Sequence, residues 1–357
     1  MLANIASFKI DYCQFLAADG QLLTGSIPPL ASNLVELESL YRQMVTTRVF
    51  DRKAVALQRT GRIGTYAPSL GHEAAHIAIG SAMLPEDCFA PSYRESGAQF
   101  CRGVRMSEAL TYWAGDERGC DFSGPRHDFA WSLAIATQCL HAAGAALAFK
   151  LRGEPRVAVC TVGDGGTSKG DFLEAINAAS AFQLPLVLVI INNQWAISMP
   201  RDKQNSARTL AQKGIAGDLP SIQVDGNDII ACRWAMENAL SSAREGNGAC
   251  VIEMLTYRLS DHTTADDAKR YRDDAEVEKA WQVEPISRLR KYLEAQGAWN
   301  AASEKALLEQ AALQVESAVK EAFSACEPGI ESMFDYMYAN LPEELAKQRA
   351  SAMQEQD

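Results

Sequence analysis

The stretch VAVCTVGDGGTSKGDFLEAINAASAFQLPLVLVIINNQWAIS, residues 157–198, decides the fold. It opens with an apolar, β-branched run at 157–162, which predicts a strand that ends in the glycine turn of residues 163–166. Apolar positions at helical spacing then predict a helix over 169–182, and the wholly apolar run 186–191 predicts a second strand, buried on both faces. A strand, a helix and a strand in this order indicate a right-handed crossover in a parallel sheet.

The crossover brings two polar turns to one edge of the sheet. Asp164 follows the first strand and Asn193 follows the second, so we expect the two side chains to meet. Carboxylate and amide oxygens suit Mg²⁺, which keeps part of its coordination shell for phosphates and water. Backbone N–H groups at the start of the helix, near Lys169, would face the same anion. The pair predicts a site for a metal-bridged diphosphate, although either half alone is also an ordinary turn or helix cap.

Strand and helix patterns alternate along much of the chain. Further strands are expected from residue 88, at 222–227 and at 249–255, and Asp228 is expected to cap the helix that follows the second of these. The alternation predicts an α/β fold with a doubly wound, mostly parallel sheet flanked by helices. Other helices are expected over residues 34–60, 106–113, 132–149, 274–293, where Pro285 is a candidate break, and 302–323.

Composition limits the classes of function. With 45 acidic against 34 basic side chains the formal net charge is -11, which argues against general binding of nucleic acid or of an anionic membrane. The hydrophobic fraction of 47% is typical of a soluble globular protein, and no apolar run approaches the length of a membrane span. The nine cysteines are scattered without CxxC spacing, as reduced thiols are. We therefore expect a cytoplasmic protein that meets any anionic cofactor with local cations.

The order Gly163-Asp164-Gly165, helix, strand and Asn192-Asn193 is similar to the signature of thiamine-diphosphate enzymes. Over about residues 40–290 the chain resembles the α subunit of the E1 component of 2-oxo acid dehydrogenase complexes, and residues 193–198, NQWAIS, are a close form of that family's segment. The resemblance implies the thiamine-diphosphate-binding fold. We divide the chain accordingly into an N-terminal extension, an α/β domain and a C-terminal tail, at 1–33, 34–330 and 331–357.

The resemblance assigns cofactor-binding roles residue by residue. Tyr and Arg both donate to phosphate oxygens, and Tyr93-Arg94 matches the pair that grips the cofactor diphosphate in the family. Main-chain contacts to the aminopyrimidine fall by position on residues 134–136, centred on Ile135. The implied metal ligands are Asp164, Asn193 and the backbone carbonyl of Trp195. The implied cofactor-binding set is Tyr93, Arg94, Ile135, Gly163, Asp164, Gly165, Gly166, Asn193, Arg258 and His262.

The polar loop after the strand expected at residues 249–255 resembles the active-site loop of the family. His262 occupies the position of the catalytic histidine, and Arg258 lies beside the diphosphate in relatives. A histidine can orient a substrate carbonyl or donate a proton, because its pKa lies near neutrality. Animal members carry regulatory phosphoserines in this loop, whereas this chain has Thr263 and Thr264, so we do not expect inherited kinase control.

Residues 72–76, HEAAH, match the HExxH pattern of zinc-binding helices. His72 and His76 are four residues apart, but no third ligand is evident nearby. The family usually has Gln at the position of His72, so any polar contact of that side chain differs here. A zinc hydrolase is the alternative from another class, and a non-catalytic subunit that retains a phosphate site is a third.

The resemblance implies oxidative decarboxylation of a 2-oxo acid, through a thiamine-bound enamine, with transfer of the acyl group to the lipoyl group of an E2 acyltransferase. In the family a β subunit supplies the carboxylate that contacts the cofactor pyrimidine. The expected assembly is therefore an α₂β₂ heterotetramer, with the E1 β subunit and the E2 lipoyl domain as partners.

Pyruvate is the expected substrate. The segments GRIGTYAPSLGHEA, residues 61–74, and MFDYMYANLP, residues 333–342, look most like bacterial pyruvate-specific α subunits. Branched-chain 2-oxo acids are the alternative, because residues 136–138 and the loop at 260–267 also occur in branched-chain relatives. The size of the pocket decides between them, and part of its wall is expected to belong to the β subunit.

Overall fold

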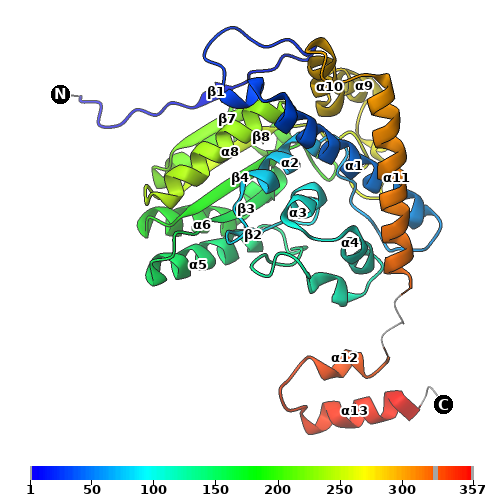
Figure 1. Cartoon of the computed structure of the whole chain (residues 1–357). Coiled ribbons are helices and arrows are strands. Elements are labelled where there is room, and N and C mark those ends of the chain that lie inside the picture. Colours follow the sequence, from blue (N-terminus) through cyan, green and yellow to red (C-terminus); the bar gives the residue numbers. More distant parts are fainter. Residues whose placement is uncertain (1, 325–328, 355–357) are drawn as a thin grey trace.

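A computed structural model describes residues 2–324 and 329–354, which fold around a six-stranded sheet (Figure 1). Every neighbouring pair of strands in this sheet is parallel, so the expected parallel α/β fold is confirmed. The strand order is β1-β7-β8-β4-β3-β2. The strands are β1 (Asp11–Cys13), β2 (Cys88–Ala90), β3 (Ala158–Gly163), β4 (Leu186–Asn192), β7 (Ser221–Asp225) and β8 (Cys250–Leu255).

Helices cover both faces of the sheet (Figure 1). α5 (Thr137–Arg152) and α6 (Gly170–Ala181) pack on one face, and α2 (Glu73–Ala82) and α8 (Ile229–Arg244) pack on the other. β4 serves both layers, because successive side chains of a strand point to opposite faces. Its residues on the α5 side are Leu186, Leu188 and Ile190, and those on the α2 side are Val187, Val189 and Ile191.

A helical layer lies beside the sheet. The long helix α1 (Leu34–Arg59) packs along α11 (Ala301–Ala322), and α4 (Met106–Trp113) joins them around a separate core that includes Phe50 and Tyr66. The expected break at Pro285 is confirmed: α9 (Asp274–Trp281) ends before it and α10 (Pro285–Ala295) begins on it. Proline suits the first position of a helix, where its missing N–H leaves no bond unmade. The shorter elements are η1 (Pro29–Ser32), α3 (Ser96–Arg102), η2 (Glu117–Cys120), η3 (Gly165–Ser168), β5 (Trp195–Ala196), β6 (Met199–Pro200), α7 (Arg201–Gln204), η4 (Ala211–Gly217), η5 (Ala268–Arg270), α12 (Ser332–Asp335) and α13 (Glu343–Gln354).

Part of the N-terminal extension belongs to the sheet. β1 pairs with β7 at the edge, and the following Leu16 is fully buried. Asp228 caps α8 as expected, and its other carboxylate oxygen accepts the N–H groups of Phe15 and Leu16, both at 2.7 Å. One buried carboxylate therefore anchors the extension to the domain. The division of the chain at residues 33 and 330 stays a prediction.

The C-terminal elements α12 and α13 lie apart from the rest of the chain (Figure 1). Two tyrosines of this region are largely exposed, Tyr336 at 91% and Tyr338 at 53%. In the described part of the chain, no helix combines the length and the apolar content needed to cross a bilayer.

The expected helix over residues 132–149 begins later than predicted. α5 starts at Thr137, and the five residues before it are irregular. Ala136 has a φ of 68°, in the left-handed region, so the helical path cannot extend back through it. The alanine-rich composition favours a helix, but residues 132–136 are not helical in the folded chain. As a result, the segment before α5 is free to line a cavity instead of forming a helical turn.

The packing of β4 makes a first prediction. Replacement of Leu188, which is 0% exposed, by alanine should lower the free energy of unfolding by about 2–5 kcal/mol, because it leaves a cavity between β4 and α5. Leu313→Ala is the matched control, since Leu313 is 73% exposed on α11 and its truncation should cost less than about 0.5 kcal/mol. Denaturant unfolding measures both values. Equal losses in the two variants would contradict the central position of β4.

Candidate active site at the carboxyl edge of the sheet

A cavity of about 640 Å³ lies where β2, β3 and β4 end. The loops after these strands form its wall together with the segment before α5 and the loop after β8. Sequence-predicted residues from all of these segments line it. They are Tyr93, Arg94, Ile135, Gly163, Asp164, Gly165, Gly166, Asn193, Trp195 and His262. Arg258 lies behind the wall, where it contacts Trp195 and His262.

Asp164 and Asn193 meet as the crossover predicts. The register pairs Gly163 with Ile191, so each residue follows its strand at nearly the same height. Asp164 is 2% exposed, and its pKa is raised to about 6 by burial, against the opposing effects of Arg258 and of backbone N–H groups that include that of Asn193. Within the described residues, its Oδ2 has no hydrogen-bond partner. A buried carboxylate oxygen without a partner is the group that a divalent cation would satisfy.

Asn193 is also suited to a cation. Its Oδ1 accepts the N–H of Trp195 at 3.2 Å, which uses one of the two lone pairs of the amide oxygen. The side chain is 7% exposed. The donor set of one carboxylate and one amide oxygen at the end of adjacent strands therefore fits Mg²⁺, with room in the cavity for phosphate oxygens and water.

Close packing around the turn after β3 requires glycine at positions 165 and 166. A Cβ atom on Gly165 would lie 2.6 Å from the Cβ of Ala196, and one on Gly166 would lie 2.5 Å from Val162 Cγ2. Both distances are far below contact between carbon atoms. Glycine thus lets the turn that carries Asp164 lie directly against the loop that carries Asn193.

Arg94 and Arg258 both contact the imidazole ring of His262 at Nδ1. Arg94 donates to the carbonyl oxygen of His262 at 2.9 Å, and its guanidinium lies 3.3 Å from His262 Nδ1. Arg258, which is fully buried, places its own Nη1 3.3 Å from the same ring nitrogen. Because guanidinium groups only donate, Nδ1 is the unprotonated acceptor and the proton lies on Nε2. The neutral ring therefore has a donor available for a ligand.

Arg258 also links His262 to the loop that follows β4. Its guanidinium donates to the carbonyl oxygens of Trp195 at 3.4 Å and Ile197 at 2.9 Å, and to the hydroxyl of Tyr271 at 2.8 Å. The resemblance assigns the carbonyl of Trp195 to the metal. This carbonyl thus lies beside the guanidinium of Arg258, which is expected at the diphosphate. That assignment stays a prediction.

Several polar side chains of the cavity were not assigned to the cofactor by the sequence. They are those of His72, Glu95, Gln138, Lys169 and Gln204. Burial raises the pKa of Glu95 to about 7, and in the part of the chain described the ring nitrogens of His72 and the Oε1 of Gln138 have no partners. A polar residue in a helix or beside a turn has no distinctive spacing, so the sequence alone gave no signal except the departure from Gln at His72. These unpaired atoms belong to residues that line the cavity, where a ligand or water could supply their partners.

The zinc alternative is not supported. Across residues 2–324 and 329–354 no group of three or more His, Cys, Asp and Glu side chains could hold a metal ion. Glu73 accepts from Arg48 at 2.7 Å and from the N–H of Gly71 at 3.0 Å, so it is used in the fold. Burial and the cation of Arg94 lower the pKa of His76 to about 3.

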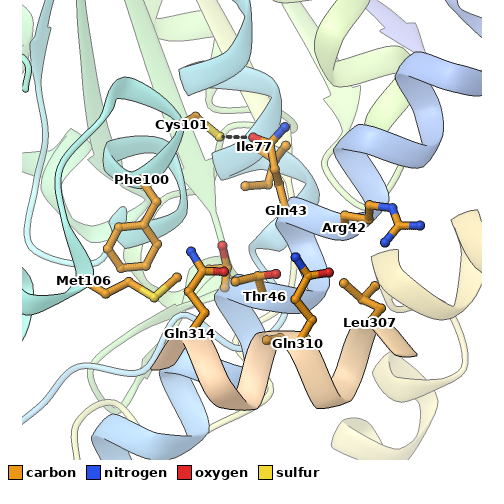
Figure 2. Close-up of a pocket in the computed structure, with 12 residues that line it drawn as sticks. Arg42, Gln43, Thr46, Ile77, Phe100, Cys101, Met106, Leu307, Gln310 and Gln314 are labelled. Carbon is orange, nitrogen blue, oxygen red and sulfur yellow. Dashed lines mark hydrogen bonds between the residues drawn. The ribbon is translucent and has the colours of Figure 1, made fainter. Parts of the chain in front are cut away.

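A second cavity, of about 270 Å³, lies between α1, α3, α4 and α11. In Figure 2, Gln310 and Gln314 rise from α11 toward Gln43 and Thr46 of α1. Among the described residues that line it there is no carboxylate, and its one arginine, Arg42, is paired with Glu38 at 2.7 Å. This cavity therefore lacks the groups that a metal-bridged anion needs.

The surroundings of His262 predict its pH dependence. Burial, Arg94 and Arg258 lower its pKa from 6.5 to about 4, so the unfolded chain binds more protons between these values. The group thus contributes stability above pH 6.5 that is lost as the pH falls toward 4. Carbethoxylation, which needs the neutral ring, should persist at His262 from pH 7 to pH 5 when followed by peptide mass spectrometry. N-acetylhistidine is the control; a decline of His262 in parallel with it would contradict the assignment.

Comparison with known proteins agrees with this site. The profile of the family described as "Dehydrogenase E1 component" matches residues 41–331. The chain is 40% identical over 349 residues to "Pyruvate dehydrogenase E1 component subunit alpha" of Staphylococcus epidermidis, an alignment that covers 97% of this chain and 93% of that protein. It is 39% identical over the same shares to the protein of that name from Staphylococcus aureus. The chain belongs to the dehydrogenase E1 component family.

Proposed function

We propose that this chain is the α subunit of a pyruvate dehydrogenase E1 component, which decarboxylates pyruvate and transfers the acetyl group to the lipoyl group of an E2 acyltransferase. The observation that carries the proposal is the buried Asp164 beside Asn193, whose Oδ2 has no hydrogen-bond partner among the described residues, at a cavity that Arg94 and His262 also line. Those features are the ones that a metal-bridged diphosphate requires. They occur in a chain that is 40% identical, over 97% of its length, to relatives with this name.

The cavity lining suits the metal ion, the diphosphate and the aminopyrimidine of bound thiamine diphosphate. Asp164, Asn193 and the carbonyl of Trp195 would hold Mg²⁺, and the N–H groups of the glycine turn would face the diphosphate. The basic and hydroxyl groups proposed for the diphosphate are Tyr93, Arg94 and Arg258. The aminopyrimidine would lie against Ile135. When bound, the cofactor supplies the electron sink that decarboxylation of a 2-oxo acid needs.

The residues of this chain would then control protons and water. His262, held by Arg94 and Arg258, directs its Nε2–H away from them, where it can donate to an oxygen of the substrate. An anion bound beside the two arginines would offset their charge and raise the pKa of His262, which prepares the ring to hold a proton. Apolar side chains of the cavity exclude water around the reacting carbon. They include Leu133, Ile135, Val162, Ile191 and Ile197.

The proposed assembly is an α₂β₂ heterotetramer whose β subunit closes the cavity. Apolar residues that line it are exposed, with Leu133 at 61%, Ile197 at 58% and Ile135 at 41%. Such a patch beside a binding cavity is typical of a protein interface. The carboxylate needed at the cofactor pyrimidine would come from the β subunit. The relatives are named as subunits, which agrees with a partner chain.

We place the protein in the cytoplasm. Each of the eight cysteines in the described residues is a free thiol, and several are buried in the core. Free buried thiols are usual in a reducing compartment. The anionic net charge gives no reason to expect attachment to nucleic acid or membrane.

The metal site makes the next prediction. Asp164→Asn should abolish the thermal stabilisation of the assembly by Mg²⁺ and thiamine diphosphate, because the cation loses its charged ligand. At a ligand concentration of about 100 times Kd the unmodified protein should gain about 2.7 kcal/mol. Asp121→Asn is the matched control, because Asp121 is exposed and its ion pair is with the exposed Arg126. An Asp164→Asn protein stabilised as much as the control would contradict the proposed site.

Activity assays test the reaction and the substrate. The α chain with its β partner should decarboxylate pyruvate with a kcat/KM at least on the order of tenfold above that for 3-methyl-2-oxobutanoate. The α chain alone should be inactive with both substrates, since its site lacks the pyrimidine carboxylate. Preference for the branched substrate would assign the chain to branched-chain metabolism instead. Robust turnover by the single chain would contradict the shared site.

A further inference from the structure

Glu253 lies in the centre of the sheet, where charge is rare. It belongs to β8, between β7 and β4, and its side chain is 0% exposed. The neighbouring strand β4 is buried along its whole length and largely apolar, and burial of a carboxylate is costly unless hydrogen bonds satisfy it. No role in binding or catalysis follows from its position alone, because it does not line the cavity.

Both oxygens of Glu253 are used by one loop. Oε1 accepts the amide Nδ2 of Asn192 at 2.6 Å, at the end of β4. Oε2 accepts the backbone N–H groups of Leu210 at 2.8 Å and Ala211 at 3.0 Å, at the start of η4. The residues on either side of the segment 193–209 therefore bind the same carboxylate. We name this segment the metal loop.

The metal loop carries the groups that the proposed site needs. It contains Asn193 and Trp195, and the carbonyl of Ile197, which accepts from Arg258 at 2.9 Å. Gln204 reaches from it to the carbonyl of Gly165 at 3.1 Å, on the turn that carries Asp164. A shift at the root of the loop would therefore move the metal ligands and the arginine together.

The backbone of the metal loop is strained and needs such an anchor. Gln194 has a φ of 72° and Ile197 a φ of 55°, in the left-handed region. A β-branched residue rarely adopts this conformation, which costs on the order of 1–3 kcal/mol and persists only when surrounding contacts hold it. Asn192, which is held by Glu253, accepts the N–H of Gln194 at 3.3 Å and its Nε2 at 2.8 Å. The hydrogen bonds of Glu253 thus reach, through Asn192, the first strained residue of the loop.

We propose that Glu253 is a positioning residue, a buried carboxylate clasp that closes the metal loop and holds Asn193 and the Trp195 carbonyl in place for the divalent cation. The part of this proposal that concerns the cation rests on the proposed function. A carboxylate is required because every partner is a donor, whereas glutamine would turn its own NH₂ group toward one of them. Partners behind a metal ligand commonly change metal affinity by 10–100-fold when they are replaced.

Hydrogen exchange tests the clasp without any cofactor. In Glu253→Gln, amides of residues 193–211 should exchange at least about tenfold faster in the unliganded assembly, because the loop opens at its root. Asp87→Asn is the matched control. Asp87 is also 0% exposed and accepts the N–H of Val157 at 3.0 Å and of Leu84 at 2.8 Å, but it lies at the opposite end of the sheet. Exchange in the metal loop that matches the control would overturn the clasp.

Titration with Mg²⁺ in the presence of thiamine diphosphate tests the consequence. Apparent Mg²⁺ affinity, followed by calorimetry, should fall about 10–100-fold in Glu253→Gln and stay unchanged in Asp87→Asn, even where both lower the melting temperature. Unaltered affinity in Glu253→Gln would overturn the positioning role. If the unmodified assembly binds no thiamine diphosphate, the proposed function fails, and the exchange experiment still decides whether the clasp exists.

A second variant covers the case in which Glu253→Gln fails to fold. Asn192→Ala removes the partner of Oε1 and leaves the two backbone bonds of Oε2 in place. Faster exchange at the start of the metal loop, with weaker Mg²⁺ binding, is the result expected from the clasp. Exchange and affinity equal to those of the unmodified protein would reject it.

Discussion

The site depends on the parallel pairing of β3 with β4. Parallel strands end at the same edge of a sheet, and the register that pairs Gly163 with Ile191 sets Asp164 and Asn193 side by side. β2 and β8 run in the same direction, so Arg94 and Arg258 reach that edge as well. An antiparallel strand at either position would send one of these groups to the far edge. The sheet topology thus brings these side chains together, and their chemical types then determine what the site can bind.

The arrangement leaves charges in need of a ligand. Burial raises the pKa of Asp164, and burial with two guanidinium groups lowers that of His262. A divalent cation would satisfy the first and an anion would offset the second, so a metal-bridged diphosphate relieves both together. The chain carries a net charge of -11, yet it gathers Arg94 and Arg258 at one point. Local charge, and not the total, sets what this cavity can bind.

Sequence periodicity predicted the fold well where burial is regular. β3, β4 and α6 begin and end within about one residue of expectation, because their apolar patterns match one structural period. The predicted start of α5 was wrong, because Ala136 adopts a left-handed backbone conformation that a helix cannot pass through. The meeting of Asp164 with Asn193 followed from the crossover, but the roles of Arg258 and His262 came only from resemblance. Glu253 was hidden in an apolar strand, where one carboxylate has no spacing to reveal it.

The central claim is that Asp164 and Asn193 share one divalent ion with a diphosphate. Crystals of the chain with its proposed β partner, grown with Mn²⁺ and thiamine diphosphate, test it most directly, because manganese scatters anomalously and takes the same oxygen ligands. We predict a single strong anomalous peak in the cavity, about 2.1 Å from a carboxylate oxygen of Asp164 and from Asn193 Oδ1. A diphosphate bound elsewhere, or bound here with no metal between these two residues, would contradict the account.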